Sequence, residues 1–311
     1  MSAVPQNRIR LLVLSGFFGS GKTTWLRHQL HEGRLRDRSV VVNEAASAPV
    51  DDALLADLAR VTVIPGGCVC CSARQAFLRV LRDHCDAERP RDIVLETSGL
   101  AEPAAIVEAV RTDPMLVHRV LIEEVIVTVD ALNALGRLRI DALIRAQVET
   151  ADVLVITKLD VLGPEEAGRL AATLRHLNPG ARIIGAIKGE AAAVPDHAHV
   201  PAENLPALGG LPADPIIAVD IDIDPAMGWE IFSVWLSALL HARGDEIFRV
   251  KGVVRTPNGR VLLQCVQKAV LPPEILPEMS EADRRFDNRL AVIGRGFDAE
   301  RLKQSLAAFG G

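Results

Sequence analysis

Residues 16–23 read Gly16-Phe17-Phe18-Gly19-Ser20-Gly21-Lys22-Thr23, which fits the phosphate-binding loop (P-loop) pattern GxxxxGK[ST]. Glycines allow such a loop to curl its backbone N–H groups around phosphate oxygens. The loop follows an apolar run, Arg8–Ser15, and opens a helical pattern, Lys22–Glu32, which is the context that the motif requires. The sequence therefore predicts a nucleoside triphosphate site, with a helix N-terminus facing the phosphates.

The residues of this loop have distinct expected roles. Lys22 places a positive charge beside the β- and γ-phosphates, and the Thr23 hydroxyl binds Mg²⁺. The residues expected to contact the nucleotide here are Gly16, Gly19, Ser20, Gly21, Lys22, Thr23 and Thr24.

Strand and helix patterns alternate along the first 188 residues. Helical stretches such as Ala131–Val148 and Pro164–Leu177 separate short apolar or β-branched runs. These runs are Arg8–Ser15, Ser39–Val42, Val61–Ile64, Ile93–Leu95, Val125–Val129, Val153–Thr157 and Arg182–Ile187. The alternation predicts an α/β domain over residues 1–188, in which helices cover both faces of a mainly parallel sheet.

The pattern changes after residue 188. Residues 189–215 are rich in Ala, Pro, Gly and His and are interpreted as a linker. A small α+β domain is expected at 216–311, because strand and helix patterns resume there around a hairpin signal, Pro257-Asn258-Gly259. Its expected elements are 216–223, Trp229–His241, Phe248–Arg255, Arg260–Ala269, Leu290–Ile293 and Asp298–Phe309.

A second part of the nucleotide site is expected where Asp92–Gly99 ends a buried strand. Glu96 is the candidate carboxylate for Mg²⁺ or its waters, and Gly99 allows the backbone to approach the γ-phosphate. We expect Lys22, Thr23 and Glu96 to carry the hydrolysis. Asp130 ends another strand and is either a further acidic group or the N-cap of a helix that begins at Ala131.

The run Thr157-Lys158-Leu159-Asp160 follows a predicted strand and is similar to the guanine-reading element of GTPases. In that element the Asp accepts hydrogen bonds from guanine N1 and N2, and the Lys stem packs on the purine. Adenine offers no such pair of donors, so a site of this kind disfavours ATP. Thr157 stands where Asn is usual, although GTPases of the signal-recognition type also carry Thr there. The three residues Thr157, Lys158 and Asp160 are thus candidates for base recognition.

Three of the five cysteines lie together in Gly66-Gly67-Cys68-Val69-Cys70-Cys71. Thiolates suit Zn²⁺ or Cu⁺, and three protein ligands leave a position open for exchange. Buried free cysteines and a redox pair remain alternatives. Glu44, after a predicted strand, is a candidate ligand for either Mg²⁺ or Zn²⁺, and His197 and His199 are weaker candidates for metal binding.

The composition is that of an ordinary globular protein. The net charge of −5 provides no basic field for nucleic acid. No apolar run reaches the roughly 18–20 residues that a membrane span needs, and no signal-peptide pattern is evident, so a cytoplasmic protein is expected. Cys85 and Cys265 are isolated and are interpreted as packing residues.

These elements together resemble the CobW-type family of P-loop GTPases, in particular its zinc metallochaperones. That family is similar to the nickel-insertion GTPases of urease and hydrogenase maturation. The elements that carry the resemblance are Gly16–Thr24, Asn43-Glu44, Gly67–Ser72, Glu96–Pro103, Thr157–Asp160, Arg249–Gly252 and Val292–Arg295.

The resemblance implies a G domain followed by a CobW C-terminal domain, and GTP hydrolysis with Mg²⁺. It also implies that Cys68, Cys70 and Cys71 hold Zn²⁺ or a similar ion, which is delivered to a client metalloprotein. Two departures are visible. Ala45 and Ala46 follow Glu44, where the family usually has an aromatic residue and glycine, and a long histidine tract is missing.

The expected mechanism is a switch. GTP and Mg²⁺ order the loops that carry Glu44 and the cysteines, and hydrolysis releases them and changes zinc affinity. No motif contains an evident general base, so slow intrinsic turnover is expected. The alternatives are a GTPase maturation factor for a cobalt or cobalamin system, a P-loop small-molecule kinase, and a metal sensor that binds nucleotide without turnover.

Overall fold

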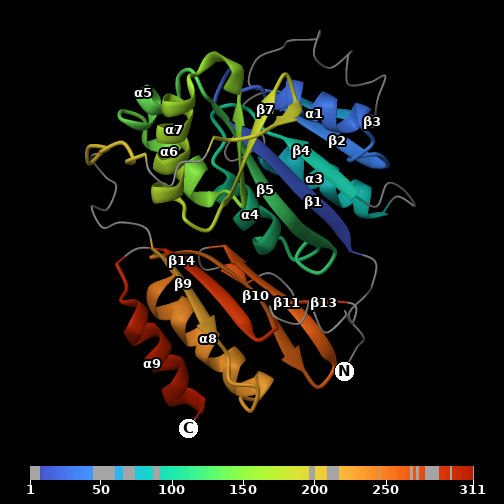
Figure 1. Cartoon of the computed structure of the whole chain (residues 1–311). Coiled ribbons are helices and arrows are strands. Elements are labelled where there is room, and N and C mark those ends of the chain that lie inside the picture. Colours follow the sequence, from blue (N-terminus) through green and yellow to red (C-terminus); the bar gives the residue numbers. More distant parts are fainter. Residues whose placement is uncertain are drawn as a thin grey trace. The chain divides into compact units, whose positions relative to one another are not determined.

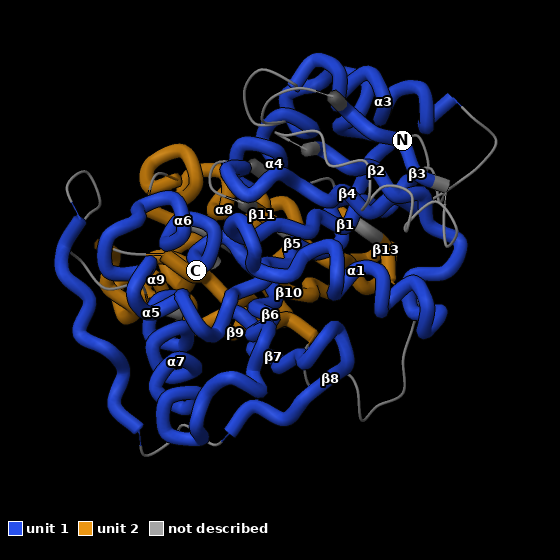
Figure 2. The backbone as a smooth tube through the Cα atoms, turned by 90° about the horizontal axis from the view of Figure 1, so that it is seen from above, with its two compact units in different colours: residues 1–177, 181–212 blue, residues 178–180, 213–311 orange. Residues whose placement is uncertain are grey.

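The computed structural model describes residues 8–44, 60–65, 74–86, 92–195, 200–208, 217–244, 246–266, 269–270, 273–276, 287–294 and 296–310. The chain divides into two compact units, one of residues 1–177 and 181–212 and one of residues 178–180 and 213–311 (Figure 2). Each unit has its own sheet, and the expected fold class is confirmed: a mainly parallel sheet with helices comes first, and a smaller α+β unit follows (Figure 1).

The first sheet has the strand order β3-β2-β4-β1-β5-β6-β7-β8, and all its pairs are parallel except that of β8 with β7. β1 therefore lies at the centre of the sheet, between β4 and β5. The strands are β1 (Ile9–Gly16), β2 (Arg38–Glu44), β3 (Arg60–Pro65), β4 (Asp92–Glu96), β5 (Val120–Asp130), β6 (Val153–Thr157), β7 (Arg182–Ile187) and β8 (Glu190–Ala192).

Helices lie on both faces of this sheet, and Figure 2 shows α1 and α4 on opposite sides of it. Right-handed crossovers require this arrangement, because the chain moves in one direction from β1 to β2 and in the other from β4 to β5. The helices are α1 (Lys22–His31), α3 (Arg74–Asp86), α4 (Pro103–Thr112), α5 (Ala134–Leu138), α6 (Ala142–Thr150) and α7 (Pro164–Leu177), with a short 3₁₀ helix η1 at Leu159–Val161.

The apolar core on the α1 side explains why these segments form these elements. Trp25, Leu26 and Leu30 recur at helical spacing on α1 and pack against alternating strand residues such as Leu12 and Leu14. Central strands such as β6 are buried along their whole length, as expected of a parallel sheet that is covered on both faces.

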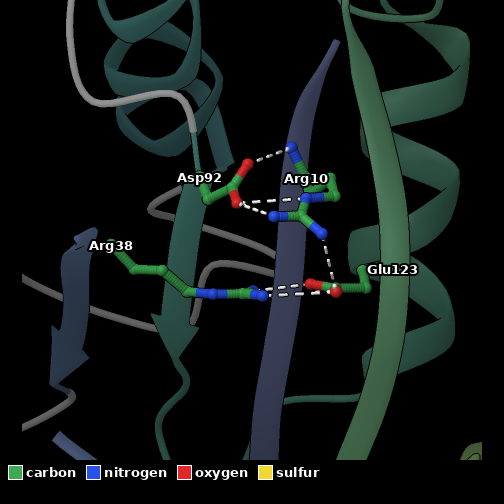
Figure 3. A network of polar contacts seen from close by, with 4 residues as sticks. All are labelled: Arg10, Arg38, Asp92 and Glu123. Atoms are coloured by element: carbon green, nitrogen blue, oxygen red, sulfur yellow. Dashed lines mark hydrogen bonds and ion pairs between the residues drawn. The ribbon is translucent and has the colours of Figure 1, made fainter. Parts of the chain in front are cut away.

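A network of charged side chains joins four neighbouring strands on the face of the sheet (Figure 3). Arg10 on β1 is paired with Asp92 on β4, its partner in the strand register. Arg38 on β2 donates to Glu123 on β5 at 2.5 Å, and Arg10 also lies 3.7 Å from Glu123. These residues stand near the beginnings of their strands, at the edge of the sheet opposite the P-loop, so the network supports strand register rather than the nucleotide site.

The prediction of a single helix at Ala131–Val148 was wrong, since the structure has α5 and α6 in its place. Asp141 causes the break: its carboxylate caps a new helix by accepting from Leu143 N at 3.0 Å and Ile144 N at 3.4 Å. The expected linker also differs from the structure at its beginning, because Glu190–Ala192 forms β8 by turning back antiparallel onto β7.

The second unit contains a sheet of order β12-β11-β10-β14-β9, in which β13 also pairs with β11 and the pairing is antiparallel. Its core includes Phe232, Trp235 and Leu236 of α8, packed with strand residues such as Val250 and Val292. The elements are β9 (Ile217–Asp222), α8 (Trp229–Arg243), β10 (Ile247–Thr256), β11 (Gly259–Val266), β12 (Ala269–Val270), β13 (Glu274–Leu276), β14 (Arg289–Gly294) and α9 (Ala299–Gly310). Within the described ranges, every helix is too short or too polar to cross a lipid bilayer.

Candidate nucleotide site

The P-loop lies between β1 and α1 and depends on glycine at three positions. Gly16, Gly19 and Gly21 have φ angles of 137°, 70° and 85°, a region that other residues rarely adopt. Space is also limiting at Gly16, where an added Cβ would overlap both the carbonyl oxygen and the hydroxyl of Thr128 and would lie 2.8 Å from Ser20 Oγ. The loop is therefore packed directly against the end of β5.

Lys22 points back into the loop that precedes it. Its ammonium donates to the carbonyl oxygen of Gly16 at 2.9 Å and to that of Phe17 at 3.2 Å. The Lys22 ammonium therefore lies inside the P-loop, where the phosphates of an incoming nucleotide would meet it. Thr24, also expected to contact the nucleotide, is exposed on the first turn of α1.

Thr23 and Glu96 meet although 73 residues separate them. The Thr23 hydroxyl donates to Glu96 Oε1 at 2.6 Å, and Glu96 is buried at the end of β4, which is the neighbour of β1. Hydroxyl and carboxylate oxygens are hard donors of the type that Mg²⁺ prefers, so the chemistry of this pair fits that ion.

The segment after Glu96 packs against the P-loop. The Thr97 hydroxyl donates to Ser15 Oγ at 3.0 Å and its backbone N–H donates to Leu14 O at 2.9 Å. Gly99 lies so close to Phe18 that an added Cβ would be 2.6 Å from the Phe18 backbone nitrogen. The sequence signal for Gly99, a glycine after the strand-end carboxylate, thus marks a real close approach of two backbones.

The run Thr157–Asp160 lies beside the same loop. The buried Thr157 hydroxyl donates to Ser20 O at 2.7 Å, so threonine at this position ties β6 to the P-loop. Lys158 has a φ of 54°, and its ammonium lies 3.0 Å from Asp130 Oδ2. Asp160 is exposed in η1, so its carboxylate is accessible from solvent.

Asp130 does not cap a helix that begins at Ala131. Its carboxylate accepts from Leu132 N at 3.1 Å and from the Asn133 amide at 2.8 Å, and the helix begins only at Ala134. The ion pair with Lys158 gives this carboxylate a third contact, which the sequence did not reveal.

Thr128 is a site residue that the sequence analysis missed. Its hydroxyl lies 2.7 Å from Ser20 Oγ, and both side chains are buried. One signal was available, since Thr128 interrupts an otherwise apolar stretch near the end of β5. A hydroxyl on a buried strand needs a partner, and here the partner is the P-loop.

The metal-binding candidates of the sequence analysis lie mainly outside the described residues. This holds for Cys68, Cys70 and Cys71, for His197 and His199, and for the side chain of Glu44. Glu44 ends β2, next to the buried Asn43. No cluster of three or more His, Cys, Asp or Glu that could hold a metal occurs within the described ranges.

Cys85 and Cys265 are both free thiols in the structure. Burial raises the pKa of the Cys85 thiol above its ordinary value, although the guanidinium of Arg119 acts in the opposite direction. A thiol that stays protonated at neutral pH is a poor metal ligand, which agrees with a packing role.

Comparison with protein families gives two matches that together span most of the chain. The model described as "CobW/HypB/UreG, nucleotide-binding domain" matches residues 10–185. The model described as "Cobalamin synthesis protein cobW C-terminal domain" matches residues 216–310.

Individual relatives agree with these matches. The chain is 34% identical to "Zinc chaperone YjiA" of Escherichia coli over 190 residues, which are 59% of this chain and 59% of that protein. It is 27% identical to "Zinc chaperone CobW" of Pseudomonas aeruginosa, over 96% of this chain and 92% of that protein. The solved structure entitled "Crystal structure of Zn(II)-bound YjiA GTPase from E. coli" has a similar fold, with a TM-score of 0.63 at 21% identity over 98% of this chain and 99% of that chain.

Proposed function

The chain belongs to the family of CobW/HypB/UreG nucleotide-binding domains, and we propose that it is a GTPase that binds Zn²⁺ and transfers it to a client metalloprotein. The proposed nucleotide binding rests on the contact between Thr23, the last residue of the P-loop, and Glu96. The relatives named zinc chaperones support the proposed zinc binding.

The P-loop residues bind the phosphates of GTP. Lys22 exchanges its contacts with the Gly16 and Phe17 carbonyls for contacts with the β- and γ-phosphates. Thr23 and Glu96 would hold Mg²⁺, which neutralises charge on the phosphates when it is bound. The backbone N–H of Gly99 faces the terminal phosphate. Catalysis thus depends on positioning and charge, and intrinsic turnover is slow.

Guanine is read by the segment after β6. Thr157 fixes this segment to the P-loop, the stem of Lys158 packs on the purine, and Asp160 accepts from the base. The Lys158 ammonium also lies 3.0 Å from the Asp130 carboxylate, which favours one orientation of the lysine stem.

We expect the substitution Asp160→Asn to lower GTP affinity at least about 10-fold, because an amide cannot accept both guanine N–H groups. Affinity for xanthosine triphosphate should rise, since its second carbonyl can accept from the new amide. Titration of each nucleotide into both proteins measures this change. An unchanged preference for GTP in the variant would remove Asp160 from the base site.

The proposed zinc binding rests on Cys68, Cys70 and Cys71, with Glu44 as a further candidate ligand. The chemistry of the thiolates suits Zn²⁺, and the incomplete ligand set suits an ion that must be passed on. GTP binding orders the loops that carry these residues, and hydrolysis releases them. Linkage then requires that zinc changes the affinity for GTP by the same factor by which GTP changes the affinity for zinc.

The test is a titration of the reduced protein with Zn²⁺ against a competing chelator under anaerobic conditions. Zinc affinity is expected to differ several-fold between the GDP-bound protein and the protein bound to a non-hydrolysable GTP analogue. Cys70→Ser should abolish the difference, and Cys85→Ser, a change at an isolated cysteine, should preserve it. Equal affinities in the two nucleotide states would contradict the coupling and favour a maturation factor without metal transfer.

A further inference from the structure

Gln147 is a buried polar residue that the proposed mechanism has not used. It lies on α6 and is only 1% exposed. Its amide nitrogen donates to the carbonyl oxygen of Ala101 at 2.8 Å and to that of Gly99 at 3.3 Å. A carboxamide nitrogen carries two N–H donors, so both are used on one short segment, the loop of residues 97–102 after β4.

This loop is the one that carries Gly99 against the P-loop. Between the two carbonyls that Gln147 holds, Leu100 is 49% exposed, so its side chain is not anchored in the core. The loop has one internal turn bond, from Ala101 N to Ser98 O at 3.0 Å. Gln147 therefore provides a connection between Gly99 and a regular element of the fold.

The space beside Gln147 is not fully packed. A pocket of about 150 Å³ opens here between α6 and the tip of the P-loop. It is lined by Phe17, Phe18 and Ser20 of the P-loop and by Ile144, Gln147 and Val148 of α6, among others. The pocket leaves one side of the Gln147 side chain unpacked, so the two hydrogen bonds, rather than packing on all sides, hold its amide against the Gly99 and Ala101 carbonyls.

The helix that carries Gln147 is itself well anchored. The Asp141 carboxylate caps its first turn, and the guanidinium of Arg145 donates to Leu138 O at 2.6 Å and to Pro206 O at 2.8 Å. Gln147 thus projects from a fixed helix onto the loop that carries Gly99, which is the arrangement that a positioning group requires.

We propose that Gln147 is a positioning residue for GTP hydrolysis: it holds the Gly99 backbone where its N–H meets the terminal phosphate of GTP. This inference rests on the proposed function. The effect is selective for GTP, because GDP lacks the terminal phosphate and gains nothing from a well-placed Gly99. Loss of the two hydrogen bonds should therefore affect GTP and spare GDP.

The variant Gln147→Met has a side chain of similar length without either donor. We expect its affinity for a non-hydrolysable GTP analogue and its kcat for GTP to fall about 10-fold, and its GDP affinity to stay within about 2-fold of the wild type. Isothermal titration with both nucleotides and a phosphate-release assay measure these quantities. A simple loss of fold stability would lower the affinities for both nucleotides together.

Gln29→Met is a matched control. Gln29 is also a buried glutamine whose amide donates to a backbone carbonyl, that of Gly189 at 3.2 Å, but it packs on the α1 face of the sheet. Its substitution should lower the thermal midpoint of unfolding to a similar extent and leave the ratio of GTP to GDP affinity unchanged. If Gln147→Met does not fold, Gln147→Leu, which also lacks both donors and carries no charge, serves in its place.

The outcomes are distinct. Equal losses of GTP and GDP affinity in the Gln147 variant, or the same selective loss in Gln29→Met, overturn the positioning role. If the wild type hydrolyses GTP and the Gln147 variant does so equally well, this inference is overturned and the proposed function stands. A wild type that neither binds nor hydrolyses GTP contradicts the proposed function, and the inference fails with it.

Discussion

Lys22→Ala is expected to reduce kcat/KM for GTP hydrolysis at least about 100-fold, the magnitude typical for loss of one preorganised charge at a reacting centre. The ammonium already lies inside the P-loop, where it donates to the carbonyls of Gly16 and Phe17. These two carbonyls are weaker partners than phosphate oxygens, so GTP should displace them and take the charge. Alanine removes the charge and leaves the glycine conformations of the loop unchanged.

Phosphate release under single-turnover conditions measures this effect, and thermal unfolding of the apo protein tests whether the fold is intact. A suitable control is Lys303→Ala, because Lys303 lies on α9 of the second unit and pairs only with Glu300 among the contacts described. Hydrolysis by Lys22→Ala within a few-fold of the wild-type rate would show that the P-loop lysine does not contact the reacting phosphates.

The second large effect is expected for Gly16→Ala, which should abolish measurable GTP binding and lower the free energy of unfolding by about 3 kcal/mol. The φ of 137° at Gly16 is strained for alanine. In addition, the new Cβ would overlap Thr128 at both its carbonyl and its hydroxyl oxygen. Because one of these atoms belongs to the backbone of β5, a side-chain rotation cannot relieve the clash, and the loop must move.

Within the same loop, Gly19→Ala separates the penalty of the positive φ angle from the penalty of the steric overlap. Gly19 also has a positive φ, 70°, but no atom lies within 4 Å of its added Cβ. The structure therefore predicts only the backbone penalty of about 1 kcal/mol for this variant. Chemical denaturation of both variants measures the difference. Equal destabilisation by the two substitutions would contradict the packing of Gly16 against Thr128.

Several elements could be predicted from the sequence to within a residue. The predicted strands at Val153–Thr157 and Arg182–Ile187 and the helix at Pro164–Leu177 have the bounds that the structure gives. Each has a local signal: a continuous apolar run for a buried strand, or proline and acidic residues in a first helical turn. The prediction for Ala131–Val148 was wrong because the Asp141 cap competes with the apolar periodicity.

The site likewise contains residues that could be predicted from the sequence and residues that could not. Thr23 and Glu96 were both expected near the phosphates, and the structure brings them to 2.6 Å. Thr128 and Gln147 were not predicted, because Gln147 has no distinctive local pattern and because a polar Thr128 in an apolar strand does not by itself identify its partner. Their partners are Ser20, 108 residues away in sequence, and Ala101, 46 residues away.

The phosphate loop, the parallel α/β fold and the family could be predicted from local sequence, because glycine conformations, apolar periodicity and motif spacing act over a few neighbouring residues. Which of these local elements contact one another depends on how the chain folds in three dimensions. The contact of Thr157 with Ser20 spans 137 residues and exists because β6 enters the sheet beside β5 and close to the P-loop. Contacts of this length depend on strand order and on the packing of helices, and no local pattern of residues encodes them.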